Sequence, residues 1–267
     1  MSPYRPKRSL GQNFLVDPNV QRRIVESLGA SGDDEVLEIG PGRGALTAHL
    51  LESGVRLTAV ELDDALAEGL REQETDRFRV VHGDVLAVDL ESLFDDWSET
   101  RVLGNIPYNI TSPIIFRLLE PPRPRDIVLL VQAEVADRLV APPGTKTYGA
   151  LSVGVRAVAE VSRLFAVPRT VFRPVPGVDS ALVRITPHRP PRVADELLPE
   201  LRRLTRATFG WRRKQLGGTL SKHPDYGHPR DAVEGLLARM GLVPSVRPER
   251  LSPEEFVALA EALASFR

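Results

Sequence analysis

The chain contains no cysteine among its 267 residues. This absence excludes disulfide bonds, thiolate metal ligands and a thiol nucleophile. Its five histidines are scattered without the spacing that holds a metal ion, so the sequence predicts a protein without a metal site. Apolar runs are short: a stretch such as residues 127–131 is too brief to span a bilayer, and no apolar core follows the basic N-terminus as it does in a secretory signal. We therefore expect a cytoplasmic protein with no membrane partner.

The chain also lacks an excess of charge of one sign. It has 35 Lys and Arg residues and 36 Asp and Glu residues, which gives a net charge of -1. Phosphate attraction dominates affinity for nucleic acids, so the distribution of the basic residues matters more than their sum. They gather in two places, near the N-terminus and beyond residue 200. The first group holds Arg5, Lys7, Arg8, Arg22 and Arg23, and the second holds Arg202, Arg203, Arg206, Arg212, Arg213 and Lys214. These groups fit contact with a polyanion, and they fit solvated helix faces equally well.

Strand-like and helix-like patterns alternate from residue 35 onward, an order that indicates a parallel, doubly wound sheet. The expected strands are residues 35–40, 56–62, 78–84, a fourth that begins at residue 101, and residues 126–132, and the first expected helices are residues 45–54 and 64–73. Two later β-rich runs near residues 160–167 and 180–186 are expected to pair as a terminal antiparallel hairpin. The predicted fold is therefore α/β, with a mostly parallel sheet of seven strands.

A linker is expected at residues 188–193, because two adjacent prolines there disfavour both a helix and a central strand. Beyond it the pattern is helical throughout. We therefore expect two domains, an α/β domain over residues 1–188 and a small helical domain over residues 194–267.

A glycine-rich turn directly follows the first expected strand and contains Gly40 and Gly42. Glycine lets the backbone turn tightly and approach a ligand closely. Glu61 ends the second expected strand, where a carboxylate can accept both ribose hydroxyls of an adenosine, and Asp84 ends the third, where it can bind the adenine amino group. Together these residues predict a cofactor that contains adenosine. The glycine spacing also fits a dinucleotide such as NAD, and it fits a tight turn with no ligand.

The tetrapeptide Asn105, Ile106, Pro107 and Tyr108 ends the fourth expected strand. An adenine amino group is a poor nucleophile because its lone pair is delocalised into the ring. Hydrogen bonds from its two N–H groups to the Asn105 side-chain oxygen and the Ile106 carbonyl would favour a pyramidal nitrogen with its lone pair free. Pro107 stiffens the turn, and the Tyr108 ring offers a stacking surface for the base. A loop with a buried tyrosine is the alternative interpretation.

Eight stretches, in this order along the chain, resemble those of the ribosomal RNA adenine dimethyltransferase family, and within it the bacterial small-subunit branch. The stretches are LGQNFLVDP, EIGPGRGALT, AVELD, GNIPYNITSPI, VQAEVADRLVA, TYGALSV, VFRPVPGVDSALVRI and FGWRRKQL. NIPY alone is moderately specific, whereas the ordered set is highly specific. Two stretches depart from the family pattern: GVDS replaces a basic residue followed by VDS, and QLGGTL replaces a segment that usually carries Asn.

The resemblance implies a Rossmann-like methyltransferase fold with S-adenosylmethionine as cofactor, and it assigns roles to particular residues. Asn13 and Leu15 would close over the cofactor, and Tyr108 and Phe172 would flank the target adenine. Without the family, Phe172 is more typical of a core aromatic. The expected cofactor contacts are Gly40, Gly42, Glu61, Leu62, Asp84, Val85 and Asn105.

The same resemblance implies dimethylation of two adjacent adenosines near the 3' end of 16S small-subunit ribosomal RNA, within an immature 30S particle. RNA would be bound through Arg212, Arg213 and Lys214 of the helical region and through Arg22 and Arg23, by a monomeric enzyme. Transfer would run directly from the sulfonium to the amine, without a metal or a covalent intermediate. Three alternatives remain: a large-subunit (23S) RNA dimethyltransferase of the antibiotic-resistance type, a non-catalytic RNA-binding assembly factor, and an NAD oxidoreductase, which leaves NIPY unexplained.

Overall fold

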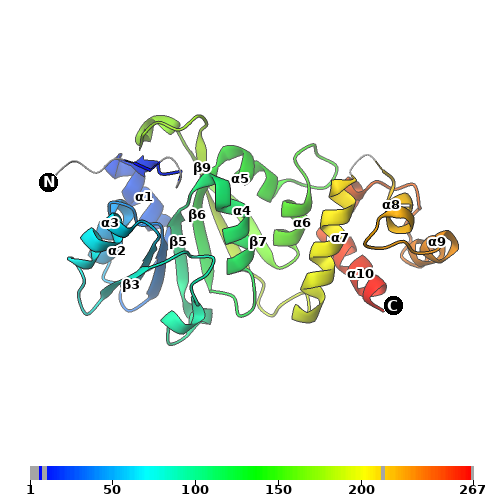
Figure 1. Ribbon diagram of the computed structural model, residues 1–267, viewed down its shortest axis with the longest axis horizontal. Helices are drawn as coiled ribbons and strands as arrows, with labels where there is room; N and C mark the ends of the chain where they lie inside the picture. The colour runs from blue at the N-terminus through cyan, green and yellow to red at the C-terminus, as the bar shows by residue number, and fades with distance from the viewer. Residues whose placement is uncertain (1–5, 8–10, 212–213, 266–267) are drawn as a thin grey trace. The chain divides into compact units, whose positions relative to one another are not determined.

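A seven-stranded sheet forms the centre of the first of two compact units in the computed structural model, which describes residues 6–7, 11–211 and 214–265. The strand order is β4-β3-β2-β5-β6-β9-β7 (Figure 1). The strands are β2 (Glu35–Ile39), β3 (Arg56–Glu61), β4 (Phe78–His82), β5 (Arg101–Asn105), β6 (Asp126–Gln132), β7 (Ala159–Val167) and β9 (Ser180–Pro187). All five predicted strands of the first part exist, and their alternation with helices produces the predicted mostly parallel sheet.

The order of the strands creates a switch point between β2 and β5. From β2 the chain builds outward through β3 and β4, each parallel to its neighbour. It then returns to pair β5 with the other side of β2 and continues to β6, again in parallel. The carboxyl ends of β2 and β5 therefore diverge into loops on opposite sides, which leaves a crevice of the kind that binds ligands in open α/β sheets.

The far edge of the sheet carries the terminal hairpin. β9 runs antiparallel to β6, with Val128 opposite Arg184 and Gln132 opposite Ser180. β7 lies beside β9, so the two strands expected in the terminal hairpin are neighbours in the sheet. β6 has six buried residues in succession, as expected for a strand covered on both faces.

Helices of the first unit are bounded by recognisable caps. The Asp17 side chain accepts hydrogen bonds from the backbone N–H groups of Asn19 and Val20, and Gly29 ends the same helix at φ 67°. The Asp63 carboxylate caps α3 in the same way. These helices are α1 (Pro18–Leu28), α2 (Ala45–Glu52), α3 (Asp64–Arg71) and α4 (Thr111–Leu118), followed by α5 (Ala133–Val140). Short 3-10 turns are η2 (Glu91–Leu93), η3 (Trp97–Glu99), η4 (Tyr108–Ile110) and η5 (Arg169–Val171).

A small second sheet, which the sequence did not predict, joins two distant segments. β1 (Phe14–Leu15) pairs antiparallel with β8 (Phe172–Arg173), so that Leu15 lies opposite Phe172. The N–H of Val16 extends this pairing by donating to the carbonyl of Val171 over 2.9 Å. Two residues per strand are too few to produce a readable alternation.

The second unit comprises residues 137–160 and 188–267, and it is helical where the structure describes it, apart from the first residues of β7. Its elements are α6 (Ala150–Arg156), η6 (Asp195–Leu197), α7 (Leu198–Gly210), α8 (Leu216–Lys222), α9 (Arg230–Arg239), η7 (Pro248–Arg250) and α10 (Pro253–Ala264). One limit of this unit, residue 188, is the last residue of the expected first domain, and residues 137–160 pack with the helical region. A buried hydrogen bond of 2.8 Å from the Tyr148 hydroxyl to the Leu251 carbonyl is one contact that joins the two segments. Within the described ranges no helix is long and apolar enough to cross a membrane.

Candidate active site

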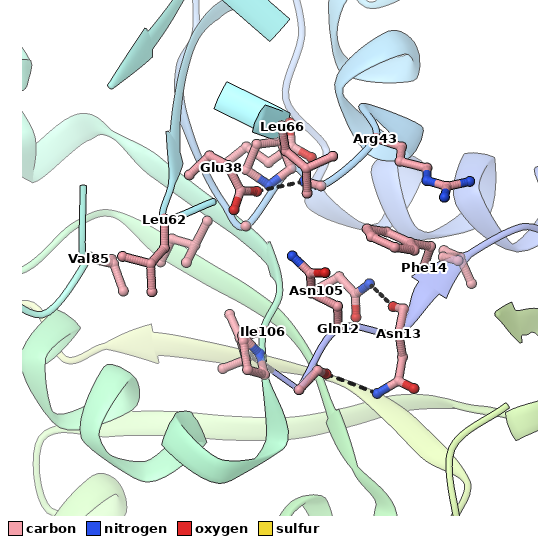
Figure 2. Close-up of a pocket in the computed structure, with 18 of the residues that line it drawn as sticks. Gln12, Asn13, Phe14, Glu38, Arg43, Leu62, Leu66, Val85, Asn105 and Ile106 are labelled. Carbon is pink, nitrogen blue, oxygen red and sulfur yellow. Dashed lines mark hydrogen bonds between the residues drawn. The ribbon is translucent and has the colours of Figure 1, made fainter. Parts of the chain in front are cut away.

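A cavity of about 470 Å³ opens at the carboxyl ends of the central strands of the first unit. Its wall contains the loop after β2, the ends of β3 and β5, the loop after β4 and the N-terminal segment. Gly40 and Asn105 meet across the switch point, because a Cβ atom added to Gly40 would lie 3.5 Å from the Asn105 carbonyl oxygen. The topology therefore brings the glycine turn and the NIPY tetrapeptide to one site (Figure 2).

The glycine turn needs its glycines for conformation and for space. Gly40 and Gly42 have φ values of 66° and 59°, in the left-handed region that other residues rarely adopt. A Cβ atom on Gly42 would also come within 3.1 Å of the Phe14 ring. The Arg43 guanidinium lies 4.7 Å from the centre of that ring. The N-terminal segment therefore packs directly on the turn.

Glu61 is held inside the cavity wall by backbone donors. Its Oε2 atom accepts from the N–H of Gly42 over 3.0 Å, and its Oε1 atom accepts from the N–H of Asp63 over 2.9 Å. Only 6% of the residue is exposed. Burial raises the pKa of the Glu61 carboxyl, and the two backbone N–H groups oppose that shift. The carboxylate thus has a fixed orientation and lone pairs left for a ligand.

The other expected cofactor contacts line the same cavity. They are Leu15, Leu62, Asp84 and Val85, together with Asn13. Asp84 is exposed, and its Oδ1 atom accepts from the N–H of Leu86 over 2.9 Å. Val85 is buried, whereas Leu62 is 44% exposed. An aliphatic surface beside an acceptor carboxylate suits a purine, which is flat and apolar on its faces and polar at its edge.

Asn105 is oriented by the N-terminal segment. Its Nδ2 atom donates to the backbone oxygen of Asn13 over 3.3 Å, and the Asn13 side chain in turn donates to the Gly11 carbonyl over 3.0 Å (Figure 2). Since the amide nitrogen is the donor, the Oδ1 atom of Asn105 remains an acceptor. We expect this oxygen atom to accept a hydrogen bond from the amino group of the target adenine.

Tyr108 is anchored at its hydroxyl and lines the cavity. The Oη atom lies 2.7 Å from the Oγ atom of Ser180, which is fully buried at the start of β9. Burial raises the pKa of the Tyr108 phenol, so it is neutral at physiological pH. Ile106, buried to 2% exposure, and Pro107 complete the tetrapeptide wall.

Phe172 does not line the cavity, although the resemblance implies that it flanks the target base. Its ring is 0% exposed and belongs to the hydrophobic core that contains Leu15, Leu182 and Ile24. The cavity wall instead contains the next two residues, Arg173 and Pro174. The pairing of Leu15 with Phe172 in the β1–β8 ladder explains this placement, because it holds the ring in the core. The core interpretation of this aromatic therefore describes the structure.

Two features of the site were not predicted from the sequence motifs. Glu38 in β2 lines the cavity, is 1% exposed, and accepts a 2.7 Å hydrogen bond from the Thr47 hydroxyl. Burial raises its pKa to about 7. Its position inside EIGPG, among apolar strand residues, was the available signal.

The second feature that was not predicted is a set of polar contacts made by the N-terminal segment. The Nζ atom of Lys7 lies 2.8 Å from Oδ2 of Asp63, whose side chain is fully buried. Gln12 also donates to Oδ2 of Asp63, over 3.4 Å, and its Oε1 accepts from the backbone N–H of Lys7. These contacts hold the N-terminal segment against the loop that follows Glu61.

Of the basic residues expected to bind RNA, Arg22, Arg23 and Lys214 lie outside the cavity wall. Lys214 is exposed in the second unit, and its N–H donates to the Trp211 carbonyl over 2.7 Å. Arg22 is exposed on α1, and the Arg23 guanidinium lies 3.9 Å from the centre of the Phe165 ring. The expected contacts Arg212 and Arg213 lie outside the described residues. In the part of the chain that the structure covers, no group of three or more His, Cys, Asp or Glu side chains could hold a metal ion.

Comparison with known proteins connects this geometry to a family. Residues 4–265 match the model of the family described as ribosomal RNA adenine dimethylase. Two curated relatives are both named Ribosomal RNA small subunit methyltransferase A. The protein of Geobacillus thermodenitrificans is 42% identical over 265 residues, or 96% of this chain and 90% of the relative. The protein of Chlorobium phaeobacteroides is 45% identical over 260 residues, or 96% and 93%.

Two solved structures are similar to this chain in fold. A dimethyladenosine transferase from Plasmodium falciparum superposes with a TM-score of 0.79 at 24% identity, over 95% of this chain and 97% of that one. The 23S rRNA methyltransferase ErmE superposes with a TM-score of 0.69 at 29% identity, over 94% and 99%. The chain therefore belongs to the ribosomal RNA adenine dimethylase family, whose members are methyltransferases with S-adenosylmethionine as cofactor.

Proposed function

We propose that this enzyme dimethylates the exocyclic amino groups of two adjacent adenosines near the 3' end of 16S small-subunit ribosomal RNA. The observation that carries the chemistry is the orientation of Asn105. Because its amide nitrogen donates to Asn13, its Oδ1 atom is available to accept from an amino group. The Ile106 carbonyl, one residue further, supplies a second acceptor, and the Tyr108 ring offers a stacking face.

The chain's own residues fit S-adenosylmethionine. Glu61, fixed by two backbone N–H groups, is placed to accept the ribose hydroxyls. Asp84 can accept from the adenine amino group, with Leu62 and Val85 against the faces of the ring. Glu38 adds a second buried carboxyl beside a ligand that carries positive charge. The turn at Gly40 and Gly42 gives the ligand close access to the backbone.

When bound, the cofactor supplies an activated methyl group on a positively charged sulfur. The protein's contribution is to position the amine, which can be worth roughly 7–11 kcal/mol. Oδ1 of Asn105 and the carbonyl oxygen of Ile106 would accept hydrogen bonds from the two N–H groups of the adenine, so that the nitrogen lone pair points away from them. With its lone pair so directed, the amine would accept the methyl group that the cofactor supplies and would release its surplus proton to solvent. The second methylation needs one hydrogen-bond acceptor fewer, because the monomethylated amino group has a single N–H.

The choice of small-subunit RNA rests on the relatives' names and on the basic C-terminal region. The relatives named for the small subunit are 42% and 45% identical to this chain, whereas ErmE, named for 23S RNA, is 29% identical. The helical unit, with exposed Lys214 and the adjacent Arg212 and Arg213, would recognise the RNA of an immature 30S particle. Arg22 and Arg23 would add contacts from α1. The enzyme would act in the cytoplasm as a monomer.

The experiment offers unmethylated small-subunit particles and protein-free large-subunit RNA to the purified enzyme with labelled S-adenosylmethionine. We expect dimethyladenosine in the small-subunit RNA alone. Label found only in the large-subunit RNA would support the resistance-type alternative. Label in neither, with tight binding to the particle, would support a non-catalytic assembly factor. The Asn105→Ala variant serves as the matched negative control.

A further inference from the structure

Exposed aliphatic side chains gather around the mouth of the cavity. Among the described residues, the large hydrophobics that are notably exposed are Val16 (46%), Leu62 (44%), Val175 (51%), Val178 (48%) and Val243 (60%). Val16 and Leu62 line the cavity itself, and Val175 directly follows Pro174, which also lines it. Single exposed apolar residues are ordinary, but three at one opening, with Val178 three residues beyond Val175 on the same loop, are a feature to explain.

The loop of residues 174–179 leads into β9 (Figure 1). It carries two of these valines, Val175 and Val178, and hydrogen bonds hold it in place. The backbone N–H of Arg169 donates to Oδ1 of Asp179 over 2.9 Å, and Nη1 of Arg169 donates to the Gly177 carbonyl over 3.0 Å. The Asp179 carbonyl accepts from the N–H of Ala133 over 3.0 Å. Pro176, between the valines, is buried. The loop is therefore braced at both ends and in its middle, and Val175 and Val178 cannot turn inward without breaking these contacts.

Positive charge borders the same loop. Arg169 and Arg173 are both exposed, and neither forms an ion pair within the described residues. Nη1 of Arg173 donates to the carbonyls of Thr170 and Phe172, over 2.8 and 2.7 Å. These neutral acceptors orient the guanidinium groups without cancelling their charge. An apolar tip between two cations is better matched to nucleic acid, which combines flat apolar bases with phosphates, than to an apolar protein surface.

The proposed function supplies a reason for such a tip. A target adenosine must leave its stack to reach Asn105, and the vacated position exposes the faces of the neighbouring bases, at a cost of a few kcal/mol. Aliphatic side chains that fill the gap offset this cost, as apolar wedges do between the base steps of kinked DNA. We propose that Val175 and Val178 form such a wedge, which contacts the RNA nucleotides that flank the target adenosine, while Arg169 and Arg173 contact their phosphates.

This inference rests on the proposed RNA substrate, and its test uses the complete enzyme. The variants are Val175→Ala, Val178→Ala and the double variant. Val243→Ala is the matched control, because it truncates an equally exposed valine in the other unit. Two substrates are compared: the unmethylated small-subunit particle, in which the target is structured, and a short unstructured RNA containing the same two adenosines. Steady-state methylation yields kcat and KM for each, and 2-aminopurine at the target position reports unstacking by fluorescence.

We expect the double variant to lose about tenfold in kcat/KM on the structured particle, since several methyl groups leave the contact. The 2-aminopurine signal should fall in parallel. On the unstructured RNA the loss should be less than twofold, and S-adenosylmethionine affinity and Tm should match those of Val243→Ala. Equal activity of the double variant and the control on the particle would overturn the proposal. So would a loss of activity on the particle with an unchanged 2-aminopurine signal, because it would indicate a contact that does not support the unstacked target. If the wild-type enzyme methylates neither RNA, the proposed function fails instead.

Discussion

The Oη atom of Tyr108 lies 2.7 Å from the Oγ atom of Ser180, at the start of β9. The two residues are 72 positions apart, and Ser180 lies opposite Gln132 of β6 in the sheet. The hydroxyl bond therefore fixes a residue of the NIPY turn to the rigid centre of the first unit. Because the Tyr108 ring is held at its hydroxyl end, it keeps the orientation needed to stack on a base. The side chain then need not be reoriented at each turnover.

The first prediction concerns this bond. Ser180→Ala and Tyr108→Phe should each lower kcat for methyl transfer about three- to tenfold, the range expected for the net value of one hydrogen bond. The double variant should be no worse than either single variant, because both remove the same bond. Affinity for S-adenosylmethionine, measured by calorimetry, should remain unchanged. Fully additive losses in the double variant would show that the bond does not position the ring. Tyr108→Ala, which removes the ring as well, should lose most of its turnover while its Tm falls by only a few degrees.

Glu61 is the basis of the second prediction. Glu61→Ala should weaken S-adenosylmethionine binding about 100-fold, because hydrogen bonds to a charged group are worth roughly 1.5–3 kcal/mol each. Part of this loss would arise because the backbone N–H groups of Gly42 and Asp63 lose the carboxylate that accepts their hydrogen bonds. Glu52→Ala, which alters a carboxylate that is 72% exposed on α2, is the control and should bind normally. Calorimetry with NAD should detect no comparable binding, and preferential binding of NAD would contradict the assignment.

Much of this site follows from local sequence patterns. The glycine turn, Glu61, Asp84 and NIPY each stand at a strand end, and in a parallel sheet such ends meet at one edge. The core position of Phe172 and the bond between Tyr108 and Ser180 do not follow in this way. They depend on the pairing of β1 with β8 and of β9 with β6, which joins residues far apart in the chain and has no periodic signature. The grouping of residues 137–160 with the helical unit was missed for the same reason.

The third prediction concerns pH. Burial raises the pKa of Glu38 to about 7, so the carboxyl is largely protonated at pH 6 and ionised at pH 8. A ligand that carries positive charge should favour the ionised form. Affinity for S-adenosylmethionine should therefore rise as pH increases from 6 to 8, by up to about tenfold, the limit for one coupled proton. Titration calorimetry in buffers of different ionisation enthalpy would measure the released proton. Glu38→Gln should bind more weakly and show a flatter pH dependence, and an equally steep dependence in this variant would assign the proton to another group.

The raised pKa of Glu38 also predicts how the stability of the protein depends on pH. A carboxyl whose pKa is higher in the folded state than its ordinary value of 4.5 contributes stability that is present below that value and is lost as pH rises toward 7. The wild-type free energy of unfolding should therefore decline across this window relative to that of Glu38→Gln, by up to about 3 kcal/mol. Denaturant unfolding of both proteins at pH 5 and pH 8 would measure the difference. A constant difference between the two proteins would contradict the account.

A further prediction concerns RNA binding by the helical unit. Reversing Arg212 and Lys214 to Glu should weaken binding to small-subunit particles and reduce the salt dependence of the affinity, since each lost phosphate contact lowers the slope by about one. Binding of S-adenosylmethionine should not change, because its cavity lies in the first unit. Filter binding at several salt concentrations would measure the affinity of each protein for the particles and its salt dependence. An unchanged slope would mean that these side chains face solvent.

The central claim is that this chain places two methyl groups on the amino nitrogen of adenosines in small-subunit RNA. Mass analysis of nucleosides from the 3' end of 16S RNA, taken from cells that lack the protein, tests it most directly. The account predicts that dimethyladenosine is absent from this RNA and returns when the wild-type chain is supplied, but not when Asn105→Ala is supplied. Dimethyladenosine at normal levels without the protein, or full recovery with Asn105→Ala, would contradict it.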